Sequence, residues 1–151
     1  MTEPLVDDLK HKLRNATEGE AIEVEAGELR VRAVVERSGA LASRLQSLDI
    51  ERKAPDSAPV DKAATRIAAS SALGERLQVL EVESHRAVVR TDPDTIREER
   101  YLDIEVSPGR MRFARFRRST RSDDSFPVPI ELTHEQCRRL VEQAAEAMEP
   151  E

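Results

Sequence analysis

The sequence predicts an α+β fold with three helices and a mainly antiparallel sheet of about six or seven strands. Three features indicate this class: apolar residues at helical spacing in three segments, three hairpin patterns, and an apparent repeat of a helix followed by three strands. The chain has 151 residues, so we expect a single domain over 1–151 that buries a core without disulfides. The helices are expected to pack on one face of the sheet.

Two helices are predicted ahead of the C-terminal region. The first covers about 4–17, where a leucine recurs at every fourth residue from Leu5 to Leu13. The second covers about 59–73, with a proline at its start and Gly74 just after its end. Small residues make up most of its apolar face, so this helix can approach the sheet closely.

The last helix is indicated by a capping box and a clear apolar stripe. The Thr133 side chain can accept from the backbone of Gln136, whose side chain can reach back to Thr133. The apolar stripe that follows consists of Cys137, Leu140, Val141, Ala144 and Met148. We expect this stripe to face the core and the charged side of the helix to face water.

Three hairpins are predicted from alternating apolar and charged residues, with turns at 26–27, 84–85 and 108–109. Each hairpin would place apolar residues on one face and Glu–Arg pairs on the other. This is typical of a sheet with one face packed on the core and one face exposed to solvent. The apolar residues expected opposite one another are Val24 and Leu29, Ile22 and Val31, Leu80 and Val89, Val82 and Ala87, Val106 and Met111, and Ile104 and Phe113.

Some segments depart from this alternation. Beyond Ala114 the pattern slips, which predicts a bulge that returns Phe116 to the apolar face. Residues 41–48 are expected to form a turn of helix and then a strand. The stretches 52–58 and 119–125 are rich in Pro, Ser and Asp, which is typical of connections.

Two tetrapeptides recur 54 residues later in the chain. Arg-Ala-Val-Val at 32–35 recurs at 86–89, and Leu-Asp-Ile-Glu at 48–51 recurs at 102–105. The same displacement aligns the first helix with the second, which predicts an internal duplication. A chance match of strand-type residues is the alternative. The predicted repeats are 4–52 and 58–106, with a further strand and helix in 110–149.

Composition indicates a reducing compartment and no membrane. Cys137 is the single cysteine, which excludes an intramolecular disulfide, and we expect a cytoplasmic protein. The first eight residues lack the pattern of a secretion signal, and no apolar run approaches the roughly 18 residues of a span. Arginine outnumbers lysine, as expected of a GC-rich bacterial genome.

The charge balance makes nucleic acid an unfavoured partner. Charged residues are 36% of the chain and the net charge is −6. Because Lys and Arg contacts to phosphates supply most non-specific affinity, an acidic protein binds DNA or anionic lipid poorly.

No catalytic, metal or cofactor site is predicted. The five glycines are scattered, so neither a phosphate loop nor a dinucleotide fingerprint is present, and no His or Cys pair has zinc spacing. His134 and Cys137 lie three residues apart on a helix, but Cys137 belongs to the apolar stripe and is expected in the core. The strand glutamates are expected opposite arginines, which favours ion pairs over acid–base catalysis.

The most distinctive charge pattern is arginine-rich and lies in 110–121. On a strand, guanidinium groups with aromatic support can bind single-stranded nucleic acid or an acidic partner. The alternative is an outer strand whose arginines pair with Glu99, Asp103 and Glu105. The candidate binding residues are Arg110, Arg112, Arg115, Arg117, Arg118, Arg121 and Phe116.

These observations favour a non-catalytic protein-binding or adaptor domain with an unidentified protein partner. In its order of helices and strands, its size and its acidity, the chain resembles the specialised chaperones of bacterial type III secretion and their non-secretion relatives. This resemblance implies homodimerisation and binding of an unfolded partner segment, and it implies no site residues. The alternatives are nucleic acid or an acidic partner bound through 110–121, and an enzyme of unrecognised class.

Overall fold

A computed structural model describes residues 3–70, 72–92, 94–95, 98–119 and 124–150. Its helices are α1 (Glu3–Asn15), α2 (Val60–Ala68) and α3 (His134–Met148). Its strands are β1 (Ala21–Ala26), β2 (Leu29–Ser38), β3 (Ala42–Arg52), β4 (Leu77–Val82), β5 (Ala87–Thr91), β6 (Asp94–Thr95), β7 (Glu98–Ser107), β8 (Arg110–Ser119), β9 (Ser125–Val128) and β10 (Ile130–Thr133).

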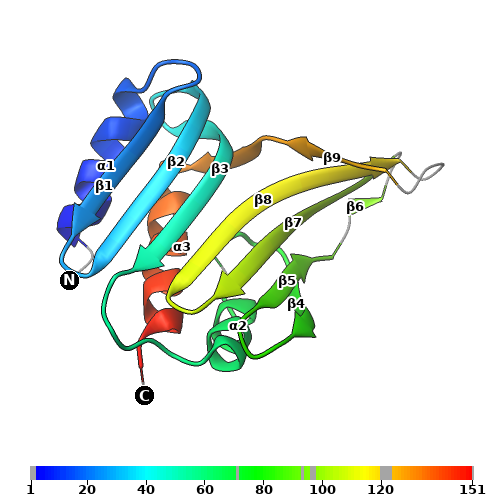
Figure 1. Cartoon of the computed structure of the whole chain (residues 1–151). Coiled ribbons are helices and arrows are strands. Elements are labelled where there is room, and N and C mark those ends of the chain that lie inside the picture. The colour runs from blue at the N-terminus through cyan, green and yellow to red at the C-terminus, as the bar shows by residue number, and fades with distance from the viewer. Residues whose placement is uncertain (1–2, 71, 93, 96–97, 120–123, 151) are drawn as a thin grey trace.

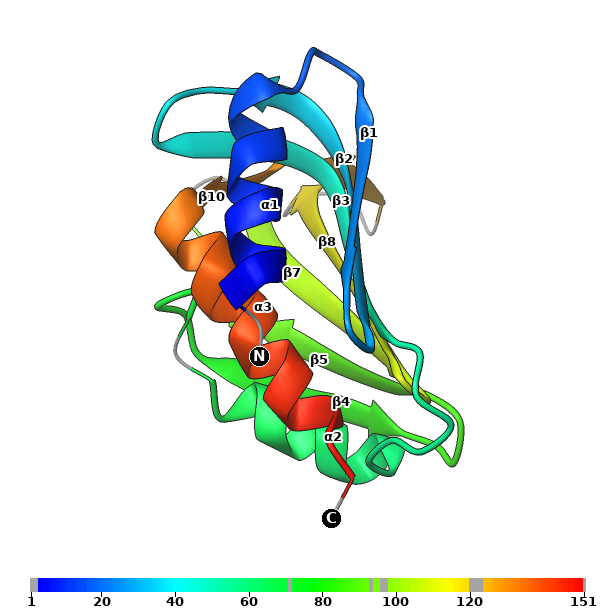
Figure 2. The same ribbon diagram turned by 90° about the vertical axis from the view of Figure 1, so that its left-hand side faces the viewer.

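The strands form one antiparallel sheet with the helices on one side of it (Figure 1). The main path through the sheet runs β1-β2-β3-β8-β7-β5-β4, and three short strands lie off this path. Figure 2 shows α1 against the β1–β2 end, α2 against the β4–β5 end and α3 between them. The predicted α+β class is therefore confirmed. We call the helix-covered side of the sheet the helix face and the opposite side the outer face.

The pairing between β3 and β8 covers only part of each strand. These strands pair over only four residues each, from Leu48 to Glu51 and from Phe113 to Arg110. Beyond this stretch, β10 continues along β3 and β9 continues along β8. The sequence pattern did not predict β9 and β10, because Pro127 and Pro129 interrupt the segment and prolines normally indicate a connection.

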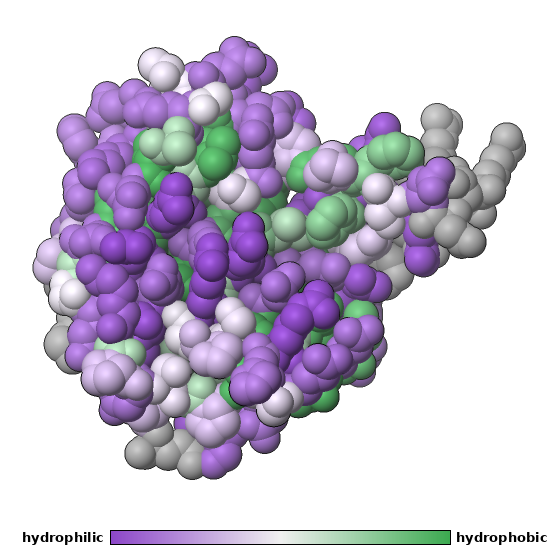
Figure 3. All heavy atoms as spheres, in the orientation of Figure 1, coloured by the Kyte–Doolittle hydropathy of each residue, from purple (hydrophilic) through white to green (hydrophobic). Residues whose placement is uncertain are grey.

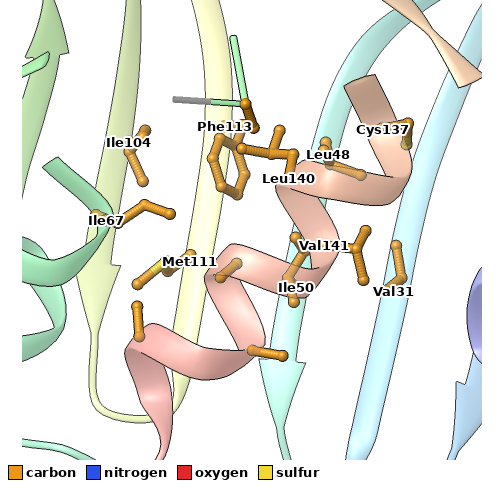
Figure 4. Close-up of a cluster of buried hydrophobic side chains, with 14 of the residues drawn as sticks. Val31, Leu48, Ile50, Ile67, Ile104, Met111, Phe113, Cys137, Leu140 and Val141 are labelled. Atoms are coloured by element: carbon orange, nitrogen blue, oxygen red, sulfur yellow. The ribbon is translucent and has the colours of Figure 1, made fainter. Parts of the chain in front are cut away.

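The core lies between the helices and the helix face. In Figure 4, Leu140 and Val141 of α3 lie over Leu48, Phe113 and Met111 of the central strands. All five side chains are at most 1% exposed. Burial on this scale is the main source of stability for a domain of this size.

The capping box of α3 is confirmed. The Gln136 N–H donates to Thr133 Oγ1 at 3.0 Å, and the Thr133 N–H donates to Gln136 Oε1 at 2.9 Å. Cys137 is buried, as expected, and burial raises the pKa of its thiol to about 12 because the apolar surroundings disfavour the thiolate.

Helix α2 ends at Ala68, five residues before its predicted end. Beyond it, the chain turns inward and buries Ala72 and Leu73. The Ala72 N–H donates to Oε1 of Gln143 on α3 at 3.2 Å. This N–H is therefore not used in a further turn of α2.

The segment 41–48 is a strand and not the predicted turn of helix. Strand β3 begins at Ala42 and pairs with β2 on one side and with β10 on the other over this segment. Hydrogen bonding to two strands outweighs the helical spacing of the leucines. Of the connection expected over 52–58, Arg52 ends β3 and residues 53–58 are irregular. Of the connection expected over 119–125, residues 120–123 lie outside the described residues.

The hairpin with its turn at Pro108 and Gly109 has the predicted register. The first hairpin turns at 27–28 instead of 26–27, so Ala26 lies opposite Leu29. Gly27 has φ +60°, and a glycine in this conformation suits the first position of a tight hairpin turn. The register moves by two residues, so the apolar residues keep their face.

The second hairpin only partly follows the prediction. Val82 lies opposite Ala87, but Leu80 forms a bulge and Val79 takes the place opposite Val89. Leu80 and Val82 are 47% and 51% exposed, so their expected packing in the core is wrong. The reason is their position on a strand at the edge of the sheet.

The bulge expected after Ala114 is absent. Strands β7 and β8 keep an unbroken register, which places Phe116 opposite Tyr101 on the outer face. Phe116 therefore lies on the opposite face from Phe113, and the prediction that it returns to the apolar face is wrong.

The structure does not confirm the predicted duplication, which stays a prediction. Residues 32–35 lie in β2 and 86–89 overlap β5, but β2 has ten residues and β5 has five. Likewise α1 has 13 residues and α2 has nine. No helix in the described part of the chain has both the length and the apolar character of a membrane span.

Candidate functional site

The arginines of β8 do not share one face of the sheet. Successive residues of a strand point to opposite sides, so Arg110 and Arg112 lie on the outer face and Arg115 and Arg117 on the other. Arg118 lies opposite Glu99 in the backbone register. Arg121 lies outside the described residues. A single guanidinium-lined face, as the sequence suggested, is therefore not formed by these side chains.

On the outer face, the β8 arginines meet Asp49 of β3. Arg110 Nε lies 2.9 and 3.1 Å from the two Asp49 carboxylate oxygens, and a second guanidinium nitrogen also contacts the carboxylate. Arg112 Nε lies 3.8 Å from Asp49 Oδ2. The hydrogen bonds that Arg110 donates to the Asp49 carboxylate raise the pKa of Arg110. These contacts support the alternative reading, in which the arginines form cross-strand ion pairs.

The partners differ from those the sequence suggested. Asp103 binds Arg90 through two hydrogen bonds of 2.5 and 2.9 Å, and Glu105 lies 3.6 Å from Arg86. The pairing of β8 with Asp49 was missed because β3 and β8 are distant in the sequence and become neighbours only in the folded sheet.

Two arginines on the other side of β8 also have partners. Arg115 NH2 lies 2.8 Å from Glu75 Oε2, and the Arg115 side chain is only 19% exposed. The Arg117 guanidinium carbon lies 5.9 Å from the ring centre of Phe126, within the range of a cation–π contact.

A hollow of about 420 Å³ lies on the outer face where β3 and β8 separate. Figure 3 shows that the surface on this side of the molecule is mostly hydrophilic with scattered hydrophobic areas. The hollow is lined by both kinds of residue, among them Leu48, Val88 and Phe113. Phe116 lines the hollow and packs against Tyr101 with ring centres 5.8 Å apart. Arg90 lies 4.4 Å above the Tyr101 ring and, as noted, binds Asp103. The charged side chains that line the hollow are held in ion pairs. This arrangement favours a structural role for these side chains over a catalytic one.

A second surface lies at the far edge of the sheet, on β4. We call Val79, Leu80 and Val82 the β4 patch; their side chains are 37%, 47% and 51% exposed. One edge of β4 pairs with β5, and the other has no partner strand in the part of the chain that the structure describes. The sequence pattern did not predict this patch, because Leu80, Glu81 and Val82 alternate as in a strand with one buried face. Val79 does not fit that alternation.

A groove of about 480 Å³ adjoins the patch, which we call the β4–α2 groove. Val82 and Glu83 form one side, and Pro59, Val60 and Asp61 at the start of α2 form the other. Ala58, which also lines the groove, donates its backbone N–H to Met148 O at 2.9 Å. This side of the groove is therefore fixed to the end of α3.

The histidine and cysteine of α3 do not form a reactive pair. His134 Nε2 lies 3.2 Å from Ser43 Oγ, and both residues are buried. Within the described residues, no three His, Cys, Asp or Glu side chains are placed to hold a metal ion.

Comparison with known proteins finds no match: no family model, no curated protein and no solved structure is similar to this chain. The candidate site therefore rests on its own geometry.

Proposed function

We propose that this protein is a non-catalytic protein-binding domain whose partner packs on the β4 patch. The observation that carries the proposal is the clustering of exposed apolar side chains on this strand. Of the five large apolar side chains exposed in the described residues, three lie within the four positions from Val79 to Val82. A cluster of exposed apolar side chains is typical of interaction sites, whereas single exposed apolar residues are ordinary.

The two edges of the sheet support the choice of β4. At the β1 edge, Lys12 of α1 donates a hydrogen bond to the backbone oxygen of Glu23 at 2.9 Å, so a charged side chain lies against that strand. Glu23 and Glu25 add further charge there. Charges of this kind protect an edge from other chains, and β4 between Val79 and Val82 has only Glu81.

The bulge at Leu80 affects how a partner can bind. A bulge interrupts the regular ladder, which makes addition of a long flat strand unfavourable. We therefore propose recognition through side chains that pack on the patch and into the groove. The proposed compartment is the cytoplasm, because the single cysteine is a buried free thiol.

Binding of synthetic peptides tests this proposal. The probes are fluorescent peptides of about ten residues with central valine and leucine residues, and matched peptides with central serines. We expect the apolar peptides to bind the native protein and to lose at least about tenfold in affinity, roughly 1.4 kcal/mol, with the Leu80→Ser/Val82→Ser variant.

Leu41→Ser is the matched control, because Leu41 is 78% exposed but lies away from β4 in the β2–β3 turn. This variant should bind the peptides as the native protein does. Equal binding by the native protein and the Leu80→Ser/Val82→Ser variant would contradict the proposal. Thermal unfolding of each variant checks that the fold is retained, which is expected because the changed side chains are exposed.

A further inference from the structure

We infer that the partner segment is basic as well as apolar, with lysine or arginine beside the apolar residues that enter the β4–α2 groove. This inference rests on the proposed function, since it describes the partner of the same surface. It follows from the charges around the groove and from the shape of its walls.

Two carboxylates line the groove, Asp61 and Glu83. Both are exposed, and neither forms an ion pair within the described residues. Glu81 lies opposite Val88 and so points to the outer face, where its charge acts on Arg90. No lysine or arginine lines the groove. The nearest cation to Glu83 along the chain is Arg86, on the other side of the β4–β5 turn, and its guanidinium group lies 3.6 Å from Glu105.

Other carboxylates of the sheet differ in this respect. Glu23 and Glu25 contact Arg30, Asp49 contacts Arg110, and Asp103 contacts Arg90. These four carboxylates of the sheet are held in cross-strand pairs. Asp61 and Glu83 have no such partner and line the groove that adjoins the apolar patch, so a cationic partner would complement them.

The groove walls suit an apolar side chain. Pro59 and Pro108 both line the groove, and proline has no backbone N–H to offer a ligand. Val60 and Val82 supply aliphatic surface between them. An aliphatic or aromatic side chain can enter this space while a neighbouring lysine or arginine remains at the rim, near Asp61 and Glu83.

The same charges argue against a second copy of this chain as the occupant. Symmetric contact between two copies of this surface would bring Asp61 and Glu83 of both copies into one interface, in a protein whose net charge is −6. Like charges about 4 Å apart repel by about 1 kcal/mol in water and more when partly buried. A basic segment of a different protein gains from these carboxylates instead.

The test compares two fluorescent peptides with the same valine–leucine centre, one flanked by lysines and one by glutamates. By fluorescence anisotropy at about 50 mM salt, the native protein should bind the lysine peptide at least about fivefold more tightly. The preference should shrink at about 500 mM salt, because exposed charges are screened.

A charge exchange in the groove should reverse the preference. The variant Asp61→Lys/Glu83→Lys should bind the glutamate peptide more tightly than the lysine peptide. The matched control is Asp7→Lys/Glu18→Lys, which makes the same change in net charge at exposed positions on and just after α1, at the other end of the sheet. The control should keep the preference for the lysine peptide.

Each outcome separates the two proposals. If both peptides bind equally and binding still requires Leu80 and Val82, the basic partner is excluded and the proposed function stands. If neither peptide binds in a way that depends on Leu80 and Val82, both proposals fail. A dimer in light scattering that dissociates on Leu80→Ser/Val82→Ser would identify a second copy as the occupant and overturn the inference.

Discussion

The Ser43 hydroxyl oxygen lies 3.2 Å from Nε2 of His134, at a buried junction of β3 and α3. Ser43 Oγ is also 3.4 Å from Ser38 Oγ, and the Ser38 hydroxyl donates to the backbone oxygen of Leu13 at the end of α1. One consistent direction of donation runs from His134 Nε2–H through Ser43 and Ser38 to Leu13. Nδ1 of His134 is then a buried acceptor without a partner in the described residues.

This junction predicts a loss of stability in mild acid. The pKa of His134 is lowered from its usual 6.5, first by burial and then by the nearby charges of Arg14 and Lys10. The unfolded chain therefore takes up the proton before the folded protein does. The stability contributed by neutral His134 is present above pH 6.5 and is lost as pH falls below it, through the lowered pKa.

Urea unfolding between about pH 5 and pH 8 measures this effect. In His134→Gln the amide nitrogen can still donate to Ser43, but it does not titrate, so the decrease in stability below about pH 6.5 should become smaller. His85→Gln is the matched control, because His85 is exposed in the β4–β5 turn and this variant should keep the native profile. A native profile in His134→Gln would exclude His134 as the cause.

Asp49 is predicted to contribute more to stability than the exposed carboxylates of the sheet. It binds Arg110 through two atoms and also approaches Arg112, and its side chain is only 18% exposed. Asp49→Asn should lower the free energy of unfolding by roughly 2 kcal/mol, because hydrogen bonds to charged groups are lost and Arg110 is left without its counter-ion.

The matched control for Asp49 is Glu131→Gln. Glu131 pairs with Arg44 across β10 and β3 at 3.1 Å, but its side chain is 70% exposed. Solvent screens such a pair, so this variant should change the free energy of unfolding by less than about 0.5 kcal/mol. Similar losses for both variants in urea unfolding would mean that burial does not strengthen the Asp49 contacts.

Gly109 should tolerate alanine less well than Gly27. Both have positive φ, +69° and +60°, so either substitution strains the backbone. A Cβ at Gly109 would also lie 3.0 Å from the backbone oxygen of Arg52, whereas none lies near Gly27. We expect Gly27→Ala to cost about 1 kcal/mol and Gly109→Ala about 2 kcal/mol or more by urea unfolding. An equal loss would show that the chain near Arg52 moves away readily.

Cys137 is predicted to be unreactive until the protein unfolds. Its thiol is 2% exposed, and burial raises its pKa to about 12, so very little thiolate forms near neutral pH. Ellman's reagent at about pH 8 should label the unfolded protein in urea rapidly and the native protein only at the rate of opening. Fast labelling in native buffer would indicate that the N-terminal half of α3 opens without global unfolding.

Local features of this fold could be predicted from the sequence because the residues that form them are near neighbours in the chain. The capping box of Thr133 and Gln136 joins residues three apart, and the hairpin at Gly109 joins strands through a two-residue turn. Both were predicted with the correct partners. The register around Gly27 was wrong by two residues, since adjacent turn positions could each accept that glycine.

The candidate site could not be predicted in the same way. Val79 and Leu80 have a pattern that fits a buried strand equally well, and their exposure depends on which strand lies at the sheet edge. The arginines of β8 were recognised as a distinctive pattern. Their partner Asp49 was not, because it lies about sixty residues away in the chain.

The amino-acid sequence by itself thus determined the α+β class, the three helices, the cap of α3 and the separation of an apolar face from a charged one. These follow from periodicity and from contacts within one or two turns of the chain. Only the tertiary structure decided that β8 lies between β3 and β7, that Phe116 points outward and that Leu80 and Val82 remain uncovered. Such outcomes depend on competition among long-range contacts, which no local spacing of residues records.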